Sequence, residues 1–383
     1  MDAFFNQALL QIDTQGQRRR RGNCLLASKP PDIDFSSNDY LGLAGNPAVA
    51  ARAQAVLQTN GWGAGASAVL SGYTPLHQEL EHALAAHCHT DAALVFSSGF
   101  AANVGALACL ATESDVIYSD ALNHASLIDG IRLSRAERTI YPHNDLEFLT
   151  TNLHANRSRF ARALIVTESV FSMDGDEACL ADLLDLCCRF DCGLIVDEAH
   201  ATGVYGATGG GLLQALQLDQ HPALVLKLGT LSKALGGIGG FAAGSAVAIE
   251  YLVNRCRSYL FSTAPPAASM AASLAALELS QGMSAARTAL QTTSFELRQQ
   301  LQRMGWNVPN GQSPILPLII GDERSSVRWS EHLSEQGMRV PAIRPPTVPP
   351  GTSRLRISLS TQHTPADLAN LVAVLETSVH GSP

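Results

Sequence analysis

The chain has 383 residues, of which 46% are hydrophobic and 16% are charged, and its formal net charge at pH 7 is −8. This length exceeds one small core and predicts two domains, or one large domain with a smaller one. The negative charge argues against nucleic acid or an anionic membrane as a partner. No stretch is apolar for long enough to span a bilayer.

The first residues and the cysteines indicate the compartment. Residues 1–5, MDAFF, lack the basic region and apolar core of a signal peptide. The eight cysteines show neither the spacing nor the histidine partners of a zinc site, and they do not suggest a disulfide framework. We therefore expect a cytoplasmic protein with reduced thiols and no metal.

Helical and strand-like patterns alternate through the first three quarters of the chain. Asn46 and Pro47 predict the start of a helix over 48–59 that Gly61 ends. Strands are predicted at 92–96, 116–118, 163–167, 193–196, 223–228 and 241–243. Asn144, with Glu147 three residues later, predicts a capping box at the start of another helix. The alternation favours an α/β fold in which helices cover both faces of a mostly parallel sheet.

The pattern changes after about residue 280. A helix over 285–304 precedes strand-like pieces at 315–320 and 355–359, and Thr364 with Pro365 begins a last helix. This order predicts an α+β C-terminal domain. We expect an N-terminal arm over residues 1–45, a large domain over 46–280 and a small domain over 281–383.

One lysine lies in a loop of small residues directly after a predicted buried strand. Lys233 is in the segment TLSKALGGIGG, residues 230–240. A lone lysine in such a loop is often a surface residue. An amine delivered by a core strand is also suited to forming a Schiff base with a carbonyl, and the hydroxyls of Thr230 and Ser232 could bind a phosphate beside it. These properties together indicate a lysine that binds pyridoxal phosphate.

Asp197 and His200 follow the predicted strand at 193–196. Ligands gather at the carboxyl ends of parallel strands. An aspartate there could pair with a protonated pyridine nitrogen, which makes the ring an electron sink, and His200 could donate to the ring's phenolic oxygen. The alternative is the acidic strand of a nucleotide hydrolase, but no G-x-x-x-x-G-K-[ST] loop precedes it.

Three further loops follow predicted strands. Gly99 and Phe100 stand where a strand turns into a helix, whose free amides suit a phosphate, although an ordinary turn explains them equally well. His124 could stack on a planar cofactor or be a common surface or core residue. Ser172 lies in a polar turn that could contact a cofactor or be a plain type I turn.

Residues 63–68, GAGASA, match the dinucleotide fingerprint G-x-G-x-x-A. The segment before them is predicted as a helix, whereas the fingerprint requires a strand. The alternative function of an NAD-dependent oxidoreductase therefore rests on this match alone.

The lysine segment fits the signature of the class II aminotransferase group of pyridoxal-phosphate enzymes. The segment FSSNDYLGL, residues 35–43, resembles the α-oxoamine synthases, which join an amino acid to an acyl thioester with loss of CO2. The resemblance extends from Phe35 to the last helix. It implies a fold-type I pyridoxal-phosphate-dependent transferase with a mostly parallel seven-stranded sheet in its large domain. It also implies a homodimer with active sites at the subunit interface.

The resemblance also implies roles for the cofactor-binding residues. Lys233 would form the Schiff base with pyridoxal 5′-phosphate (PLP), and Asp197 would pair with its pyridine nitrogen. The other residues it assigns to the cofactor are His124, stacked on the ring, His200 and Ser172 on the ring's oxygen side, and Gly99, Phe100 and Thr230 at the phosphate. Lys233, His124, Asp197 and His200 are the expected catalytic residues.

The substrate residues follow from the same resemblance. Arg356 would bind the amino acid's carboxylate through its guanidinium fork, with His124 and Thr347 beside the substrate, and Arg18 or Arg19 would be the substrate-contacting arginine of the N-terminal arm. The run at 342–356 is most similar to the family member that condenses L-alanine with pimeloyl-CoA or a pimeloyl-carrier protein. Members of the 5-aminolevulinate synthase, glycine C-acetyltransferase and serine palmitoyltransferase types remain alternatives, because pocket shape decides between them.

Overall fold

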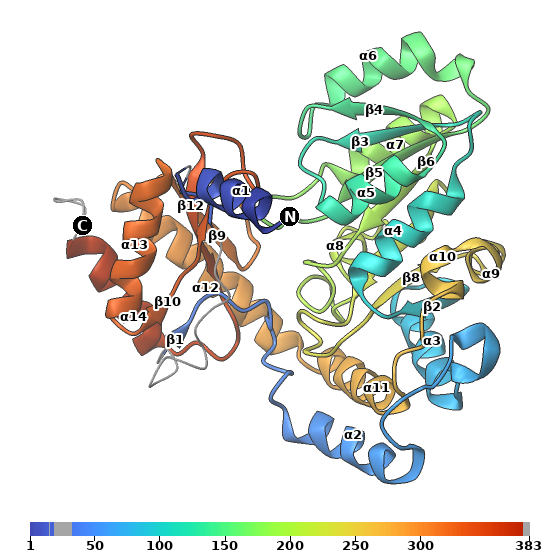
Figure 1. The fold of residues 1–383 in the computed structure, drawn as a ribbon, viewed down its shortest axis with the longest axis horizontal. Coiled ribbons are helices and arrows are strands. Elements are labelled where there is room, and N and C mark those ends of the chain that lie inside the picture. Colours follow the sequence, from blue (N-terminus) through green and yellow to red (C-terminus); the bar gives the residue numbers. More distant parts are fainter. Residues whose placement is uncertain (15, 19–32, 378–383) are drawn as a thin grey trace. The chain divides into compact units, whose positions relative to one another are not determined.

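The computed structural model describes residues 1–14, 16–18 and 33–377, which divide into two compact units (Figure 1). The unit we call the sheet unit comprises residues 38–172 and 176–289. The unit we call the terminal unit comprises the described residues of 1–37, residues 173–175 and the chain from 290 onward. The three-part domain division with boundaries at 45 and 280 stays a prediction.

A seven-stranded sheet organises the sheet unit, with the strand order β2-β8-β7-β6-β5-β3-β4. Neighbouring strands pair in parallel except for β8, which is antiparallel to both β2 and β7. The predicted α/β fold with a mostly parallel seven-stranded sheet is therefore confirmed. The strands are β2 (Ala92–Phe96), β3 (Val116–Asp120), β4 (Glu137–Tyr141), β5 (Ala163–Glu168), β6 (Gly193–Asp197), β7 (Leu224–Thr230) and β8 (Gly240–Gly244).

Six of these strands match the predicted ones, and β4 is the one that the sequence does not predict. β4 lies at the edge of the sheet, where only its last residue, Tyr141, is buried. An edge strand that faces solvent needs no apolar run, so hydrophobicity does not reveal it.

Helices lie on both sides of the sheet (Figure 1). They are α2 (Pro47–Asn60), α3 (Pro75–His87), α4 (Gly99–Leu110), α5 (Ala125–Leu133), α6 (Leu146–Asn156), α7 (Leu180–Phe190), α8 (Leu212–Ala215), α9 (Ala246–Arg255), α10 (Arg257–Leu260) and α11 (Ala267–Gln281), with a π-helical turn over Ala68–Gly72 and a 3-10 turn over Arg157–Arg159.

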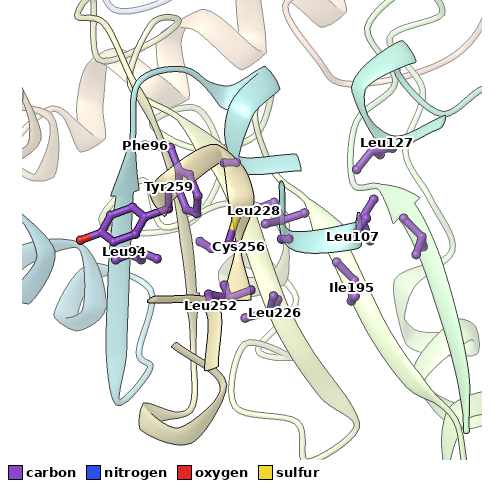
Figure 2. Close-up of a cluster of buried hydrophobic side chains, with 14 of the residues drawn as sticks. Leu94, Phe96, Leu107, Leu127, Ile195, Leu226, Leu228, Leu252, Cys256 and Tyr259 are labelled. Atoms are coloured by element: carbon purple, nitrogen blue, oxygen red, sulfur yellow. The ribbon is translucent and has the colours of Figure 1, made fainter. Parts of the chain in front are cut away.

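A hydrophobic cluster fixes α4 and α5 to one face of the sheet (Figure 2). Strand residues Phe96 and Leu228 pack there with Leu107 of α4, Leu127 of α5 and Tyr259 of α10, each at most 9% exposed. Burying one such side chain contributes about 1.5–3 kcal/mol. The cluster therefore sets where the N-terminal end of α4 lies against the strands.

Capping explains where two helices begin. The Asn46 side chain accepts from Ala48 N at the start of α2, and Gly61 follows its end with a φ of +73°, as predicted. The predicted cap at Asn144 is wrong, because Asp145 caps α6 by accepting from Phe148 N at 2.8 Å. Asn144 instead donates its side-chain amide to the Glu177 carbonyl.

The terminal unit is α+β, as predicted. Its two-stranded sheet pairs β1 with β10 in parallel, and its three-stranded antiparallel sheet has the order β11-β12-β9. Residues from 290 onward in α12 belong to this unit. Its elements are α1 (Asp2–Thr14), β1 (Ile33–Asp34), α12 (Ser284–Arg303), β9 (Ile315–Gly321), α13 (Glu323–Glu335), β10 (Met338–Arg339), β11 (Ala342–Ile343), β12 (Ser353–Ser358) and α14 (Pro365–Thr377). Among the described residues, no helix has both the length and the apolarity to cross a membrane.

Candidate active site

The carboxyl ends of β6 and β7 bring the predicted lysine and histidine together. Lys233 lies three residues beyond the end of β7, and its Nζ is 2.8 Å from His200 Nε2. His200 Nδ1 is in turn 2.7 Å from the Tyr40 hydroxyl, and that hydroxyl donates to Asn38 Oδ1 at 3.2 Å. The lysine amine is thus held at one end of a chain of polar side chains.

Asp197 is the last residue of β6 and is 5% exposed. Its Oδ2 accepts a hydrogen bond from Asn103 Nδ2 at 2.6 Å, and its Oδ1 accepts one from Ala199 N at 2.8 Å. With both oxygens bonded, the carboxylate is fixed at the edge of the sheet where parallel strands present ligands.

His124 stands at the N-terminal end of α5. Its Nδ1 accepts from Ser126 N at 3.2 Å and lies 2.7 Å from Ser126 Oγ. The residue is exposed at the surface, yet the surrounding protein desolvates the imidazole and so lowers its pKa. The charges of Asp197 and Lys233 also act on this pKa, in opposite directions, so all three groups belong to one site.

Glu168 ends β5 and is 3% exposed. Burial raises the pKa of its carboxyl well above the usual value, and the charge of Asp197 raises it further. Its Oε1 meets no hydrogen-bond partner within the described part of the chain. A second buried carboxyl therefore lies beside Asp197, its partner across β5 and β6.

The N-terminal end of α4 forms a cradle with the end of β7. Ser98 caps this twelve-residue helix by accepting from Ala101 N at 3.0 Å. A Cβ on Gly99 would lie 3.1 Å from Thr230 Cβ, and one on Gly240 would lie 2.5 Å from Gly99 Cα. The two glycines thus let the start of α4 lie close against the neighbouring strand ends, next to helix amides that have no intrahelical partner and carry partial positive charge.

Hydroxyl groups complete the cradle. Thr230 Oγ1 donates to the Gly239 carbonyl at 2.9 Å and lies 2.8 Å from Ser232 Oγ. Ser232 and Phe100 are both exposed. Amides and hydroxyls at a helix N-terminus suit a phosphate group.

The contacts of the other predicted residues do not test the roles expected of them. Ser172 lies in the turn after β5. Arg356 is a buried residue of β12 that donates to Ser358 Oγ at 2.8 Å, and Thr347 is exposed in a turn of the same unit. Arg18 lies 3.5 Å from Asp13 of α1, whereas Arg19 falls outside the described residues. The roles of these residues stay predictions.

Sequence reasoning missed four residues of the site, Asn103, Ser126, Tyr40 and Glu168. Each of the four lies inside or next to a segment that attracted attention for another residue. The signal that could have found them is polarity at the carboxyl ends of predicted strands or in the helix turns that follow.

The dinucleotide-like segment at 63–68 lacks the context that its motif needs. It follows α2, which ends at Asn60, and it leads into the π-helical turn at Ala68–Gly72. A dinucleotide fingerprint joins a strand to a helix, so the match carries no cofactor argument here.

The fold and the site together define a class of protein. A lysine amine and a buried aspartate at the carboxyl ends of a seven-stranded sheet, with an anion cradle on the next helix, are the elements of a fold-type I PLP-dependent enzyme.

Comparisons with known proteins agree with this class. The family model described as aminotransferase class I and II matches residues 30–375. A curated 8-amino-7-oxononanoate synthase from Azoarcus sp. (strain BH72) is 43% identical, with 96% of this chain and 95% of the relative covered. The 8-amino-7-oxononanoate synthase 2 of Bacillus subtilis (strain 168) is 41% identical, with 97% and 96% covered.

Solved structures give the same result. A serine palmitoyltransferase from S. paucimobilis with a bound PLP–myriocin aldimine aligns with a TM-score of 0.86 and 29% identity over 91% of this chain and 88% of that one. The 8-amino-7-oxononanoate synthase of Francisella tularensis aligns with a TM-score of 0.79 and 28% identity over 91% and 98%. The chain therefore belongs to the class I and II aminotransferase family and, within it, to the 8-amino-7-oxononanoate synthases.

The residues present fit the cofactor of this family. An amine for a Schiff base, a carboxylate for the pyridine nitrogen and a helix end for the phosphate lie in one unit of the chain. PLP is therefore the cofactor of this protein, as predicted, and the protein is a PLP-dependent acyltransferase.

Proposed function

We propose that the protein condenses L-alanine with a pimeloyl thioester, carried by CoA or by a carrier protein, in biotin biosynthesis. The products are 8-amino-7-oxononanoate, CO2 and the free thiol carrier. The observation that carries this proposal is the Lys233 amine held 2.8 Å from His200 in the same site as Asp197. The names of the relatives support the choice of substrates.

Bound PLP supplies an electron sink for negative charge at the amino acid's α-carbon. Lys233 would hold its carbonyl carbon, and Asp197 would pair with the pyridine nitrogen. The remaining contacts are proposed for His124 on the ring face, His200 and Ser172 on the ring's oxygen side, and Gly99, Phe100 and Thr230 at the phosphate.

The chain's own residues determine how protons move. A charged Lys233 amine donates to His200 Nε2 at 2.8 Å, so that the ring proton lies on Nδ1 and is donated to Tyr40 at 2.7 Å. This arrangement leaves the lysine beside an acceptor that can take its proton. Once neutral, the amine removes the α-proton of the bound amino acid as a general base.

Further residues are proposed to contact the substrates. Arg356 is proposed to bind the carboxylate of alanine, since a guanidinium offers two parallel donors to it. Thr347 and Arg18 or Arg19 are proposed to contact the substrates, and the protein is proposed to act as a cytoplasmic homodimer.

A substrate panel tests the proposal. The release of free thiol is measured with alanine, glycine and serine, each combined with pimeloyl-, succinyl-, acetyl- and palmitoyl-CoA and with a pimeloyl-carrier protein. Alanine with a pimeloyl thioester should give the highest kcat/KM, and mass spectrometry should detect 8-amino-7-oxononanoate. A preference for glycine with succinyl- or acetyl-CoA, or for serine with palmitoyl-CoA, would replace this assignment by another member of the family.

A further inference from the structure

His124 is the N-cap residue of α5. Its Nδ1 accepts the backbone N–H of Ser126 at 3.2 Å. Because a backbone amide can only donate, Nδ1 carries no proton in this arrangement. The position in the fold thus constrains the protonation state of the ring.

The hydroxyl of Ser126 obeys the same constraint. Its Oγ lies 2.7 Å from His124 Nδ1, so the hydroxyl must be the donor of this bond. The oxygen itself accepts from Asn103 Nδ2 at 2.9 Å. Ser126 and Asn103 are 0% and 4% exposed, so water does not compete with these bonds.

The orientation of the Asn103 amide is fixed at its other hydrogen bond. Its Nδ2 also donates to Asp197 Oδ2 at 2.6 Å. Rotating the amide would turn its oxygen toward the carboxylate, where no proton is available between them. The hydrogen-bond donors therefore run in one direction, from Asn103 to the hydroxyl of Ser126 and from there to Nδ1 of His124.

We propose that Asn103 and Ser126 are positioning residues that hold His124 as a neutral imidazole with its single proton on Nε2. The inference deepens the proposed function and rests on it, because that function places the His124 ring against the face of the cofactor. A neutral ring sets no positive charge against the protonated pyridine nitrogen that Asp197 binds. The Nε2–H group remains as a donor for bound substrate.

The charged groups around His124 act in both directions. Desolvation has the largest effect on its pKa and lowers it, the charges of Asp197 and Asp129 raise it, and that of Lys233 lowers it. The positive end of α5 also disfavours a charged ring. Glu168 accepts the backbone amide of His124, and burial raises the pKa of its carboxyl. The helix α4, which packs on α5, contributes the uncharged Asn103, whose amide bonds to Ser126.

The test measures the tautomer and titration of His124 by NMR. The full-length holoenzyme, without substrate, carries histidine labelled with carbon-13 and nitrogen-15 in the ring, and a His124→Gln variant assigns the signal. The wild type should show the proton on Nε2 and a pKa below the ordinary 6.5. The measurement on the wild type needs no variant of Asn103 or Ser126.

Two serine variants on the same helix test the role of the network. Ser126→Ala removes a donor to the unprotonated Nδ1, so the pKa of His124 should rise by about one unit, and the acidic limb of kcat/KM should move with it. Ser134→Ala is the matched control, because that hydroxyl donates to the Ile131 carbonyl at the other end of α5. It should leave both values unchanged.

Two outcomes would overturn the proposal. One is a wild-type His124 that is charged at pH 7.5 or carries its proton on Nδ1. The other is a Ser126→Ala variant whose His124 titrates no differently from that of Ser134→Ala. If the substrate panel fails but the tautomer is found on Nε2, the proposed function is wrong and the positioning role stands.

Discussion

Two lysines six residues apart occupy contrasting sites on the same strand and its loop. Lys227 lies inside β7, is 1% exposed and donates to the Cys88 carbonyl at 2.7 Å. Lys233 lies beyond the strand, is partly exposed and contacts the side chain of His200. The more deeply buried lysine is therefore the one bonded to the main chain, and the lysine that solvent reaches is bonded to a titratable side chain.

Their surroundings differ in the same way. Asp197 and Glu198 are consecutive, and strand alternation sends them to opposite faces of the sheet. Glu198 Oε1 accepts from Leu213 N at 2.9 Å, and its charge interacts with that of Lys227. On the Asp197 face, side chains bond one another beside the cradle at the start of α4. We call Lys227 and Glu198 the buried pair. The polar groups of the buried pair bond to the backbone. Those on the Asp197 face bond mainly to other side chains, at the edge of the sheet where parallel strands present ligands.

The largest expected effect is that of Lys233→Ala on turnover. Removing the amine would remove both the proposed Schiff base and the proposed general base, so kcat should fall at least about a thousandfold. The visible absorbance of the Schiff base should disappear as well. The midpoint of thermal unfolding should change little, since the side chain is partly exposed. Full activity in this variant would show that Lys233 does not serve the chemistry.

Lys227→Met should have the converse effect, which is to lower the stability of the protein while the Lys233 site keeps its chemistry. It leaves the buried Cys88 carbonyl without its donor and removes the positive charge that lowers the pKa of Glu198, which together should cost about 3 kcal/mol in the free energy of unfolding. Denaturant unfolding measures this loss, and Lys233→Met serves as the matched control. At low temperature, the folded Lys227→Met protein should keep the Schiff-base absorbance. Lost absorbance with unchanged stability would place the buried pair in the active site instead.

The pH dependence of stability should distinguish the two faces further. Burial raises the pKa of Glu198 from 4.5 to about 7. The folded protein therefore keeps this proton at pH values where the unfolded chain has released it. The free energy of unfolding should then fall as pH rises from about 4.5 to 7, by roughly 3 kcal/mol.

Glu198→Gln isolates this contribution, because the amide oxygen can still accept from Leu213 N. Denaturant unfolding of both proteins at pH 5 and pH 7 gives the difference between them. The wild type should lose more stability than the variant over this interval. Equal losses would mean that Glu198 is already ionised throughout it.

The sequence predicts the Lys233 site better than the buried pair. Apolar runs locate the strands, and the polar residues after them must gather at one edge of a parallel sheet. No local pattern shows that Lys227 bonds to Cys88, since the two lie 139 residues apart in the chain. Inside an apolar run, a lysine looks like an interruption of the strand.

Positions that depend on helix packing are also hidden from the sequence. Asn103 and Ser126 meet only because α4 packs against α5. The cap at Asp145 is a different case, since two neighbouring residues compete for one role. The Asn144 side chain instead donates to the Glu177 carbonyl, which lies 33 residues further along the chain. The local pattern therefore indicates the wrong residue.

The smallest expected effect concerns the cradle at the start of α4, which is proposed to hold the cofactor's phosphate. A Cβ on Gly240 would lie 2.5 Å from both Gly99 Cα and Gly99 N, and the core cluster holds α4 in place against it. Relief of this overlap in Gly240→Ala should displace the helix end at a cost of about 1–3 kcal/mol, equivalent to about a tenfold to hundredfold weaker affinity for PLP.

Gly282→Ala is the matched control, because its Cβ would lie 3.5 Å from the nearest atom, Leu279 O, an ordinary contact. Titration of PLP into the apo forms of both variants, followed by absorbance, measures the difference. If Gly240→Ala binds PLP as tightly as Gly282→Ala, the start of α4 does not hold the phosphate, and what separates the two lysine sites reduces to the side chains around Lys233.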